Sequence, residues 1–427
     1  MHAPIRLVTA RADRSAQHQT IVVVSQVYVP DPTSVGQHVA DAAAELAARG
    51  YKVIVFTSDR GFDDPSVRYL PNERINGVDI RRLPFSSFGK RSILIRLLGG
   101  VLFLAQVIVR ALFVRHVDTV LVSTSPPMAG LAGVVLATLR RARLVYWVMD
   151  LNPDQAVALG VVEPHSRSVR MYDWMNRVIL GRANAVVALD RLMAARIAVK
   201  RDIGERMHIL PPWPHEDHIA PVARAGNPFR ATHGLDGKFV VMYSGNHSPA
   251  NPLRTVIDAA LALQGDPDIV FAFVGGGGGK REVDDAGSSN ILSLPYQPME
   301  TLHFSLAAAD LHVVTMGNDM VGIIHPCKVY GALAAARPIL FVGPSECHVA
   351  DLMKRRDIGW RVSHGDVAGT VNAIRAAARL SREEIGALGD GAYTLIASEL
   401  SKAELCARFC DIVAGVRELD ARSLAPL

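Results

Sequence analysis

Cysteine is scarce in this 427-residue chain, and its placement argues against two common uses of the residue. The four cysteines all lie in the last quarter, at Cys327, Cys347, Cys406 and Cys410. They form no Cys-x-x-Cys pair and have no histidine at ligand spacing, so neither a disulfide framework nor a structural zinc site is predicted. A reducing, cytoplasmic compartment fits this pattern.

Long apolar runs are missing as well. The first 20 residues lack the apolar core of a signal peptide, so we expect residues 1–20 to be a disordered lead-in. Residues 97–109 are uncharged but shorter than the roughly 20 residues that a spanning helix needs. Residues 119–139 are interrupted by Pro126 and Pro127. We therefore predict no transmembrane helix.

Neither sign of charge dominates the composition. Lysine and arginine total 46 against 41 acidic residues, which gives a formal net charge of +5. This balance permits an anionic ligand or lipid surface, and no arginine-rich arm calls for nucleic acid. We expect no nucleic-acid partner.

Two familiar phosphate-binding motifs are absent. The glycine run 275–279 precedes Lys280, but a P-loop would need glycine at Val274 and serine or threonine at Arg281. No Gly-x-Gly-x-x-Gly follows the first apolar run. The sequence thus favours neither a P-loop triphosphate-binding site nor a dinucleotide-dependent oxidoreductase. The glycine run is predicted to be a pliable loop at the carboxyl end of a strand.

What the chain does contain is an alternation of Val/Ile-rich runs with Ala/Leu-rich segments of helical period. Near-continuous apolar runs indicate parallel strands covered on both faces. The runs begin at Ile21, Lys52, Asp118, Arg143 and Asn184, and the rhythm restarts at Lys238, Asp268, Leu311 and Pro338. We predict an α/β fold with two doubly wound, Rossmann-like domains that face each other across a cleft.

The expected boundaries follow from composition. The first domain is predicted at 21–213, a Pro-, Gly-, His- and charge-rich linker at 214–237, and the second domain at 238–400. A C-terminal helical segment covers 401–427, with a return to the first domain as one option. Ligands of such sheets sit beyond the carboxyl ends of the strands, so the loops there are where function is expected.

Two such loops in the first half carry candidate site residues. Gly36 opens a helix after a Pro-rich loop, where free amides and the helix dipole favour phosphate; an ordinary turn with a packing glycine is the alternative. Asp150 ends an apolar run and can orient a hydroxyl or stabilise positive charge, or it can simply cap the next helix.

Two loops in the second half also carry candidate site residues. Gly245, Asn246 and His247 follow a strand in the same manner. Lys328 is predicted in the first turn of an Ala-rich helix, where the dipole disfavours a cation, so the lysine indicates an anionic partner unless it is a solvated surface residue.

The segment 90–116 has a different character. Apolar residues are interspersed with Arg91, Arg96, Arg110 and Arg115, which is typical of a basic amphipathic helix at an anionic bilayer surface. A buried core helix with charged ends is the alternative.

Taken in order, these segments resemble the landmarks of family 4 glycosyltransferases with the GT-B fold. The resemblance spans about 21–416 and is strongest to the branch that builds bacterial exopolysaccharide and O-antigen units. It rests on IVVVSQVYVPDPTSVGQHVADAAAELAARGYKVIVFTS, WVMDLNPDQAVALG, HILPPW, VVMYSGN, ILSLPYQPMETLHFSLAAADLHVVTM and HPCKVYGALAAARPILFVG.

The resemblance implies a retaining transfer of a hexosyl or N-acetylhexosaminyl group without metal or cofactor. The donor would be a nucleotide diphosphate sugar held mainly by the second domain, and the acceptor a lipid-linked glycan at the inner face of the cell membrane. The family is expected to use same-face attack through an oxocarbenium-like ion pair, with the leaving phosphate taking the acceptor's proton and no enzyme nucleophile.

The resemblance also implies roles for individual residues. The diphosphate would meet Gly36, Lys328 and the amides around Gly322 and Ile324. Gly245, Asn246 and His247 match a phosphate-facing loop, Leu294 and Tyr296 a base-holding segment, and Asp150 a position near the anomeric carbon.

One departure from the family pattern stands out. Many relatives carry two glutamates eight positions apart, and the matching residues here are Ile323 and Gly331. The loss indicates altered donor recognition, and it keeps open a non-catalytic donor-binding subunit. A GT-B nucleotide-sugar epimerase is a further alternative.

Overall fold

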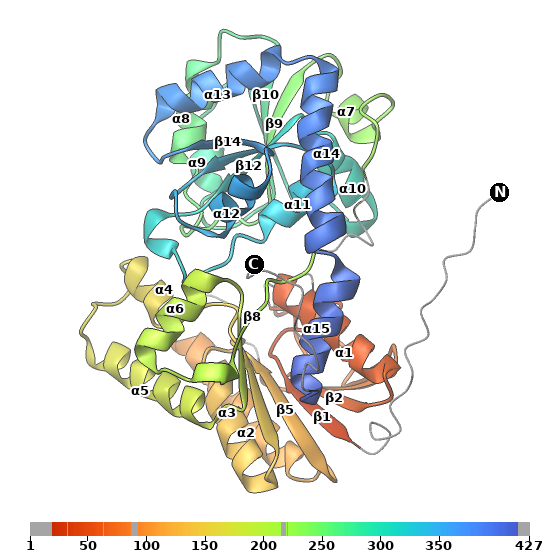
Figure 1. Ribbon diagram of the computed structural model, residues 1–427, viewed down its shortest axis with the longest axis vertical. Helices are drawn as coiled ribbons and strands as arrows, with labels where there is room; N and C mark the ends of the chain where they lie inside the picture. Colours follow the sequence, from red (N-terminus) through yellow and green to blue (C-terminus); the bar gives the residue numbers. More distant parts are fainter. Residues whose placement is uncertain are drawn as a thin grey trace, which may run out of the picture.

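The computed structural model describes residues 19–31, 33–62, 64–86, 93–214, 219 and 221–416. Arg91, the side chain of Arg96 and residues 1–18 of the expected lead-in lie outside this description. Two α/β domains follow one another along the long axis, with the N-terminal domain at the bottom of Figure 1.

The N-terminal domain is built on an eight-stranded sheet of order β3-β4-β2-β1-β5-β6-β7-β8, in which only the β3–β4 pair is antiparallel. Its strands are β1 (Thr20–Val24), β2 (Lys52–Ser58), β3 (Asn72–Ile75), β4 (Val78–Leu83), β5 (Val117–Ser123), β6 (Arg143–Trp147), β7 (Ala185–Ala188) and β8 (Met207–Ile209). Its main helices are α1 (Ser34–Ala48), α2 (Ile93–Ala111), α3 (Ala129–Arg140), α4 (Asp154–Ala158), α5 (Arg167–Arg182) and α6 (Arg191–Lys200). Every residue of β1 and β7 is buried, as expected for parallel strands covered on both faces.

The C-terminal domain contains a fully parallel six-stranded sheet of order β11-β10-β9-β12-β13-β14. Its strands are β9 (Phe239–Ser244), β10 (Ile269–Val274), β11 (Ile291–Leu294), β12 (Leu311–Thr315), β13 (Ile339–Val342) and β14 (Gly359–Val362). Its helices are α7 (Pro228–Thr232), α8 (Arg254–Ala262), α9 (Lys280–Asp284), α10 (Leu302–Ala307), α11 (Lys328–Ala334), α12 (His348–Arg355), α13 (Val367–Arg379) and α14 (Arg382–Glu399), and α15 (Lys402–Ala414) follows them. The predicted fold of two Rossmann-like domains is therefore confirmed.

The last helix joins the two domains. α15 leaves the C-terminal domain and packs beside α1, where the blue and red helices adjoin in Figure 1. The ring of Phe409 lies 4.1 Å from that of Trp147 at the end of β6, and Arg49 bonds Asp411 at 2.6 Å. α15 therefore belongs to the core of the N-terminal domain.

Much of the stretch 224–237, inside the expected linker, is packed against the C-terminal domain. Arg230 of α7 is 1% exposed and donates to the carbonyls of Ala308 and Leu235 and to the carboxylate of Asp310. A buried guanidinium with several acceptors fixes this stretch in place, because an unpaired buried charge is costly.

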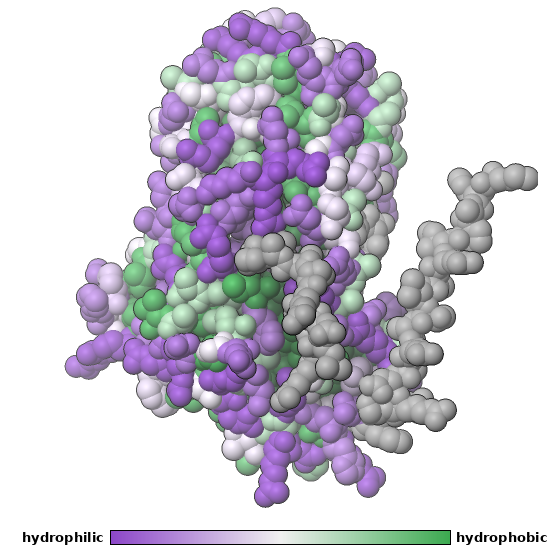
Figure 2. All heavy atoms as spheres, viewed as in Figure 1, coloured by the Kyte–Doolittle hydropathy of each residue, from purple (hydrophilic) through white to green (hydrophobic). Residues whose placement is uncertain are grey.

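Surface character differs between the domains. Figure 2 shows a mainly hydrophilic C-terminal domain on the visible face, whereas apolar residues gather on the N-terminal domain just below the domain boundary. Among the described helices, none combines the length and apolar character needed to cross a bilayer.

Candidate functional site

Strand order reverses once in the core of each sheet, and the two reversal points carry the candidate residues. In the N-terminal sheet β1 lies between β2 and β5, and in the C-terminal sheet β9 lies between β10 and β12. The chain diverges at such a point, and the loops beyond the carboxyl ends of the strands leave space for a ligand. Asp150 follows β6, beside β5, while Gly245 follows β9 and Lys328 lies in the segment after β12.

Asp150 is held just past the end of β6. The backbone amides of Met149 and Asp150 both donate to the hydroxyl of Thr124, at 3.2 and 3.3 Å, which ties this loop to the loop after β5. Burial penalises the carboxylate and raises the pKa of Asp150 to about 6. The helix that follows is capped by Pro153 without a side-chain bond, so Asp150 does not cap it.

Lys328 begins α11 and extends along Gly245. A Cβ on Gly245 would lie 2.8 Å from Cε of Lys328, and Gly245 has φ +129°, so this close approach requires glycine. The ammonium nitrogen lies 5.5 Å from the centre of the Tyr243 ring. Burial penalises the ammonium and lowers the pKa of Lys328 to about 8. A lysine in this position gains charge most readily when an anion binds beside it.

The loop after β9 interlocks with the glycine run after β10. A Cβ on Gly275 would lie 2.1 Å from the Gly245 carbonyl, and one on Gly277 would lie 2.1 Å from Oδ1 of Asn246. Gly275 and Gly277 therefore close against residues 245–247 without leaving room for a side chain at either position. The sequence prediction of a loop at a strand's carboxyl end is confirmed, and its physical reason is backbone packing.

His247 is enclosed by these two loops. Its backbone amide donates to the Gly276 carbonyl at 2.7 Å, and Nδ1 lies 3.2 Å from the same oxygen. A carbonyl only accepts, so Nδ1 carries the proton and Nε2 is left as an acceptor. Nε2 is buried and has no hydrogen-bond partner within the described chain. Burial, and after it the charges of Lys280 and Lys328, lower the pKa of His247 and so favour the neutral ring.

Leu294 and Tyr296 lie on the far side of the glycine run. The Leu294 carbonyl accepts from the Gly275 amide at 2.9 Å, and the Tyr296 hydroxyl donates to the Gly276 carbonyl at 3.3 Å. The Tyr296 ring is 57% exposed. The structure thus brings Gly245, Asn246, His247, Leu294, Tyr296 and Lys328 to one edge of the C-terminal sheet.

The remaining predicted donor residues have other surroundings. Gly36 is buried, and its amide donates to the Thr33 hydroxyl that caps α1, at 3.3 Å. The Ile324 amide donates to Met320 at 3.3 Å, and Gly322 packs against the Leu192 carbonyl of α6. Within the described residues Gly36 and Lys328 make no direct contact, so the structure does not bring these two together.

The segment before Lys328 contacts the N-terminal domain through a set of polar bonds. The Leu151 amide, next to Asp150, donates to the Ile323 carbonyl at 2.9 Å. His325 lies 3.0 Å from the carboxylate of Asp190, and this bond together with the α6 amides holds the pKa of Asp190 below its usual value. These bonds place Asp150 and Lys328 on the two sides of one boundary, which we call the interdomain site.

Sequence reasoning missed this polar boundary. Asp190 and His325 are 135 positions apart, and neither has a motif that links it to the other. From His325 the network continues to the Tyr330 hydroxyl at 2.7 Å and on to His348 at 3.1 Å. A further pair joins Arg191 to Asp351 at 2.8 Å. A strand that ends in aspartate before a helix was the only available signal for Asp190.

The two positions that lack the family glutamates present no carboxylate. Ile323 is 2% exposed and uses its carbonyl for the bond to Leu151. Gly331, one turn into α11, has only the Leu306 side chain within 4 Å of a built Cβ. Neither position therefore offers a carboxylate oxygen to a ligand at this edge.

A family model described as a glycosyl transferase 4-like domain matches residues 33–213. The chain is 25% identical to a probable glycosyltransferase, WbjE of Pseudomonas aeruginosa, covering 64% of this chain and 69% of WbjE. It is 26% identical to WcaI of Escherichia coli (strain K12), described as a putative colanic acid biosynthesis glycosyl transferase, covering 74% and 81% of the two chains.

Solved structures agree on the fold. Sucrose-phosphate synthase of Thermosynechococcus elongatus superimposes with a TM-score of 0.74 at 16% identity, covering 93% of this chain and 98% of that one. HepE of Anabaena, solved with UDP and glucose, gives 0.68 at 15% identity, covering 93% and 100%. At such identities the likeness concerns the fold alone, which is GT-B.

Proposed function

We propose that this protein, a family 4 glycosyltransferase of the GT-B fold, transfers a sugar from a nucleotide diphosphate donor to a lipid-linked glycan acceptor in polysaccharide biosynthesis. The donor lies against residues 245–247 and Lys328, and the acceptor approaches from the N-terminal domain. The observation that carries the proposal is the pairing of a half-buried lysine, Lys328, and a half-buried carboxylate, Asp150, on opposite sides of one domain boundary. The names of WcaI and of the UDP complex of HepE support this assignment.

The buried groups suggest how charge is handled. Lys328, with a pKa lowered to about 8, becomes fully charged when the diphosphate binds and offsets its charge without a metal ion. Asp150 stabilises positive charge that develops at the anomeric carbon, because a carboxylate in a poorly solvated site acts strongly on a nearby cation. The leaving phosphate takes the acceptor's proton, and the new bond forms on the same face of the sugar.

His247 adds a specific contact to this proposal. Its free Nε2 is an acceptor, so it suits a sugar hydroxyl better than a phosphate oxygen. In this chain, which lacks both glutamates, the imidazole is a replacement acceptor for a donor hydroxyl.

A lipid acceptor requires access to a membrane surface, and α2 supports a peripheral location at the inner face. One side of α2 packs into the core through Phe103, Val107 and Ala111. The other side is an apolar stripe, exposed to solvent and continued just past the helix, formed by Leu98, Val101, Leu102, Val109, Leu112 and Phe113. Its basic neighbours Arg110 and Arg115 complement an anionic surface.

The test is a panel of nucleotide sugars incubated with the protein and cell membranes as the acceptor source, read by the mass of lipid-extractable product. One donor should give a product heavier by one sugar residue. Incubation of that donor alone separates the alternatives: an epimerised nucleotide sugar would identify an epimerase. Donor binding by calorimetry with no product from any acceptor would identify a non-catalytic donor-binding subunit, the alternative that the two missing glutamates leave open.

A further inference from the structure

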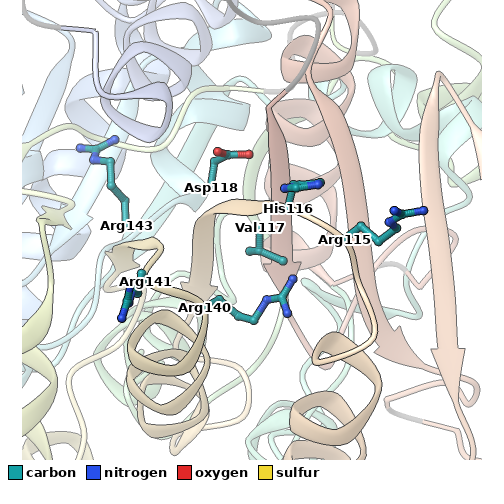
Figure 3. Close-up of a pocket in the computed structure, with 7 residues that line it drawn as sticks. All are labelled: Arg115, His116, Val117, Asp118, Arg140, Arg141 and Arg143. Atoms are coloured by element: carbon teal, nitrogen blue, oxygen red, sulfur yellow. The ribbon is translucent and has the colours of Figure 1, made fainter.

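A second cationic site lies at the opposite edge of the N-terminal sheet. A cavity of about 580 Å³ is lined by Arg115, His116, Val117, Asp118, Arg140, Arg141 and Arg143, shown in Figure 3. Val117 and Arg143 are the first residues of β5 and β6, whereas Asp150 follows the last residues of β6. The seven residues of β5 separate the two sites by roughly 20 Å. We call this cavity the arginine pocket.

Two of its arginines have structural roles. Arg140, at the end of α3, donates to the carbonyls of Leu112 and Val114, which follow α2. Arg143 donates to the carbonyls of Ile412 and Val413 in α15, at 3.4 and 3.0 Å. Such bonds satisfy carbonyls at helix ends and would be expected without any ligand.

The other two arginines lack that explanation. Arg115 and Arg141 are exposed, and neither guanidinium group has a hydrogen-bond or ion-pair partner in the ranges that the structure describes. The pocket holds one carboxylate, Asp118, which accepts from the Thr20 amide at 2.8 Å. Four guanidinium groups against one carboxylate leave an excess of positive charge, and guanidinium groups suit the oxygens of a phosphate.

The surroundings indicate where that phosphate comes from. The apolar stripe ends at Phe113, which is 83% exposed and stands two residues before Arg115. At its other end, a Cβ on Gly100 of α2 would lie 3.5 Å from Pro126, in the loop after β5. α2 therefore runs from the interdomain edge of the sheet to the arginine pocket. A phosphate held beside an exposed apolar stripe matches a phospholipid, in which the headgroup and the acyl boundary are adjacent.

We propose that the arginine pocket binds the phosphate headgroup of an anionic phospholipid while the apolar stripe lies on the same bilayer. The proposal rests on the membrane-surface part of the proposed function and adds a discrete headgroup site to it. Bound in this way, the protein rests along α2, with the interdomain edge turned toward the surface that carries the acceptor.

The experiment compares two double variants of the full chain by flotation with vesicles. Arg115→Gln/Arg141→Gln removes the unpaired guanidinium groups, and Arg379→Gln/Arg382→Gln removes the same charge from exposed positions of the C-terminal domain. The vesicles contain equal amounts of phosphatidylcholine and phosphatidylglycerol, with pure phosphatidylcholine as reference. At about 1 kcal/mol per arginine near an anionic surface, the pocket variant should bind about thirtyfold more weakly, and the control should bind as the unmodified protein does.

Three outcomes would overturn the headgroup site. Equal loss in both double variants would mean a diffuse attraction that depends on net charge. Equal flotation of the unmodified protein on pure phosphatidylcholine would mean that the apolar stripe alone suffices. Calorimetric binding of glycerol 3-phosphate that the pocket variant loses, without any effect on flotation, would assign the pocket to a soluble phosphate.

Failure of this inference is distinguishable from failure of the proposed function. Normal flotation behaviour with no sugar transfer to any acceptor would reject the transferase and keep the headgroup site. Sugar transfer to detergent-dispersed acceptor, with flotation unaffected by the pocket substitutions, would reject the headgroup site and keep the transferase.

Discussion

The interdomain site and the arginine pocket both carry positive charge, but they hold it in different ways. At the interdomain site a single half-buried lysine packs against Gly245, and its partial burial lowers its pKa to about 8. In the arginine pocket four guanidinium groups stand around an open cavity, and two of them are exposed without a partner in the described chain. The charge of Lys328 therefore depends on what binds beside it, whereas the guanidinium groups of the arginine pocket are always charged.

The difference reflects the task proposed for each site. A half-buried ammonium interacts with a bound diphosphate at short range, where salt screens the attraction little. Exposed arginines act over about a Debye length and tolerate many headgroup positions. Substitutions at the interdomain site should therefore change catalysis and donor affinity while vesicle binding stays the same, and the arginine pocket should show the reverse.

The largest effect on turnover is expected for Asp150→Asn. Loss of the carboxylate removes stabilisation of positive charge in the transition state, so kcat should fall about 10²- to 10³-fold, as for other groups that act on transition-state charge. Donor affinity, measured by calorimetry, should change by less than about threefold, since the substitution is isosteric. Asp319→Asn, an exposed carboxylate in the segment after β12, is the matched control. Equal losses in kcat and donor affinity would reduce Asp150 to a structural residue.

Lys328→Met is expected to weaken donor binding most. The methionine keeps the packing against Gly245 and Tyr243 but loses the charge, so affinity for the nucleotide sugar should drop about ten- to hundredfold, the range for bonds to charged groups. Lys354→Met, whose partner Glu346 lies on the surface, controls for the loss of one lysine. Unchanged donor affinity in the calorimeter would remove Lys328 from the site.

The same variant has a signature in the pH profile. Asp150 is charged above about pH 6 and Lys328 below about pH 8, so kcat/KM of the unmodified protein should rise through the first value and fall through the second. Donor phosphate stabilises the ammonium, so the alkaline limb of kcat should lie at higher pH than that of kcat/KM. Lys328→Met should abolish the alkaline limb and leave the acidic one. An alkaline limb that persists in this variant would belong to another group.

Much of the fold could be predicted from the sequence because buried parallel strands have continuous apolar runs. The runs that begin at Ile21, Lys238 and Leu311 became β1, β9 and β12. The strands β3, β4, β8, β11 and β14 were missed, and most of them lie at or beside sheet edges, where half-exposed residues break the apolar pattern.

The candidate site was predictable only in part. Positions at strand ends identified Asp150 and Gly245, since topology alone brings such ends to one edge. The bond between Asp190 and His325 depends on how the domains meet, which no local pattern encodes. The arginine pocket likewise joins residues 115–118 to residues 140–143 across the β5–β6 pair, although the sequence Leu-Arg-Arg-Ala-Arg was a visible signal.

Gly245→Ala should have the smallest effect on donor binding. It tests whether packing against Gly245 is what makes the charge of Lys328 depend on its surroundings. The new Cβ would lie 2.8 Å from Cε of Lys328, and the backbone at this position has φ +129°, which residues other than glycine rarely adopt. Displacement of the lysine toward solvent should weaken donor binding severalfold and move the alkaline limb of kcat/KM up toward the ordinary lysine pKa, because less burial means less penalty on the charge. Gly278→Ala, in the adjoining glycine run with nothing within 4 Å of its Cβ, should change neither quantity. An alkaline limb that stays at about pH 8 in Gly245→Ala would show that packing against Gly245 does not set the charge of Lys328.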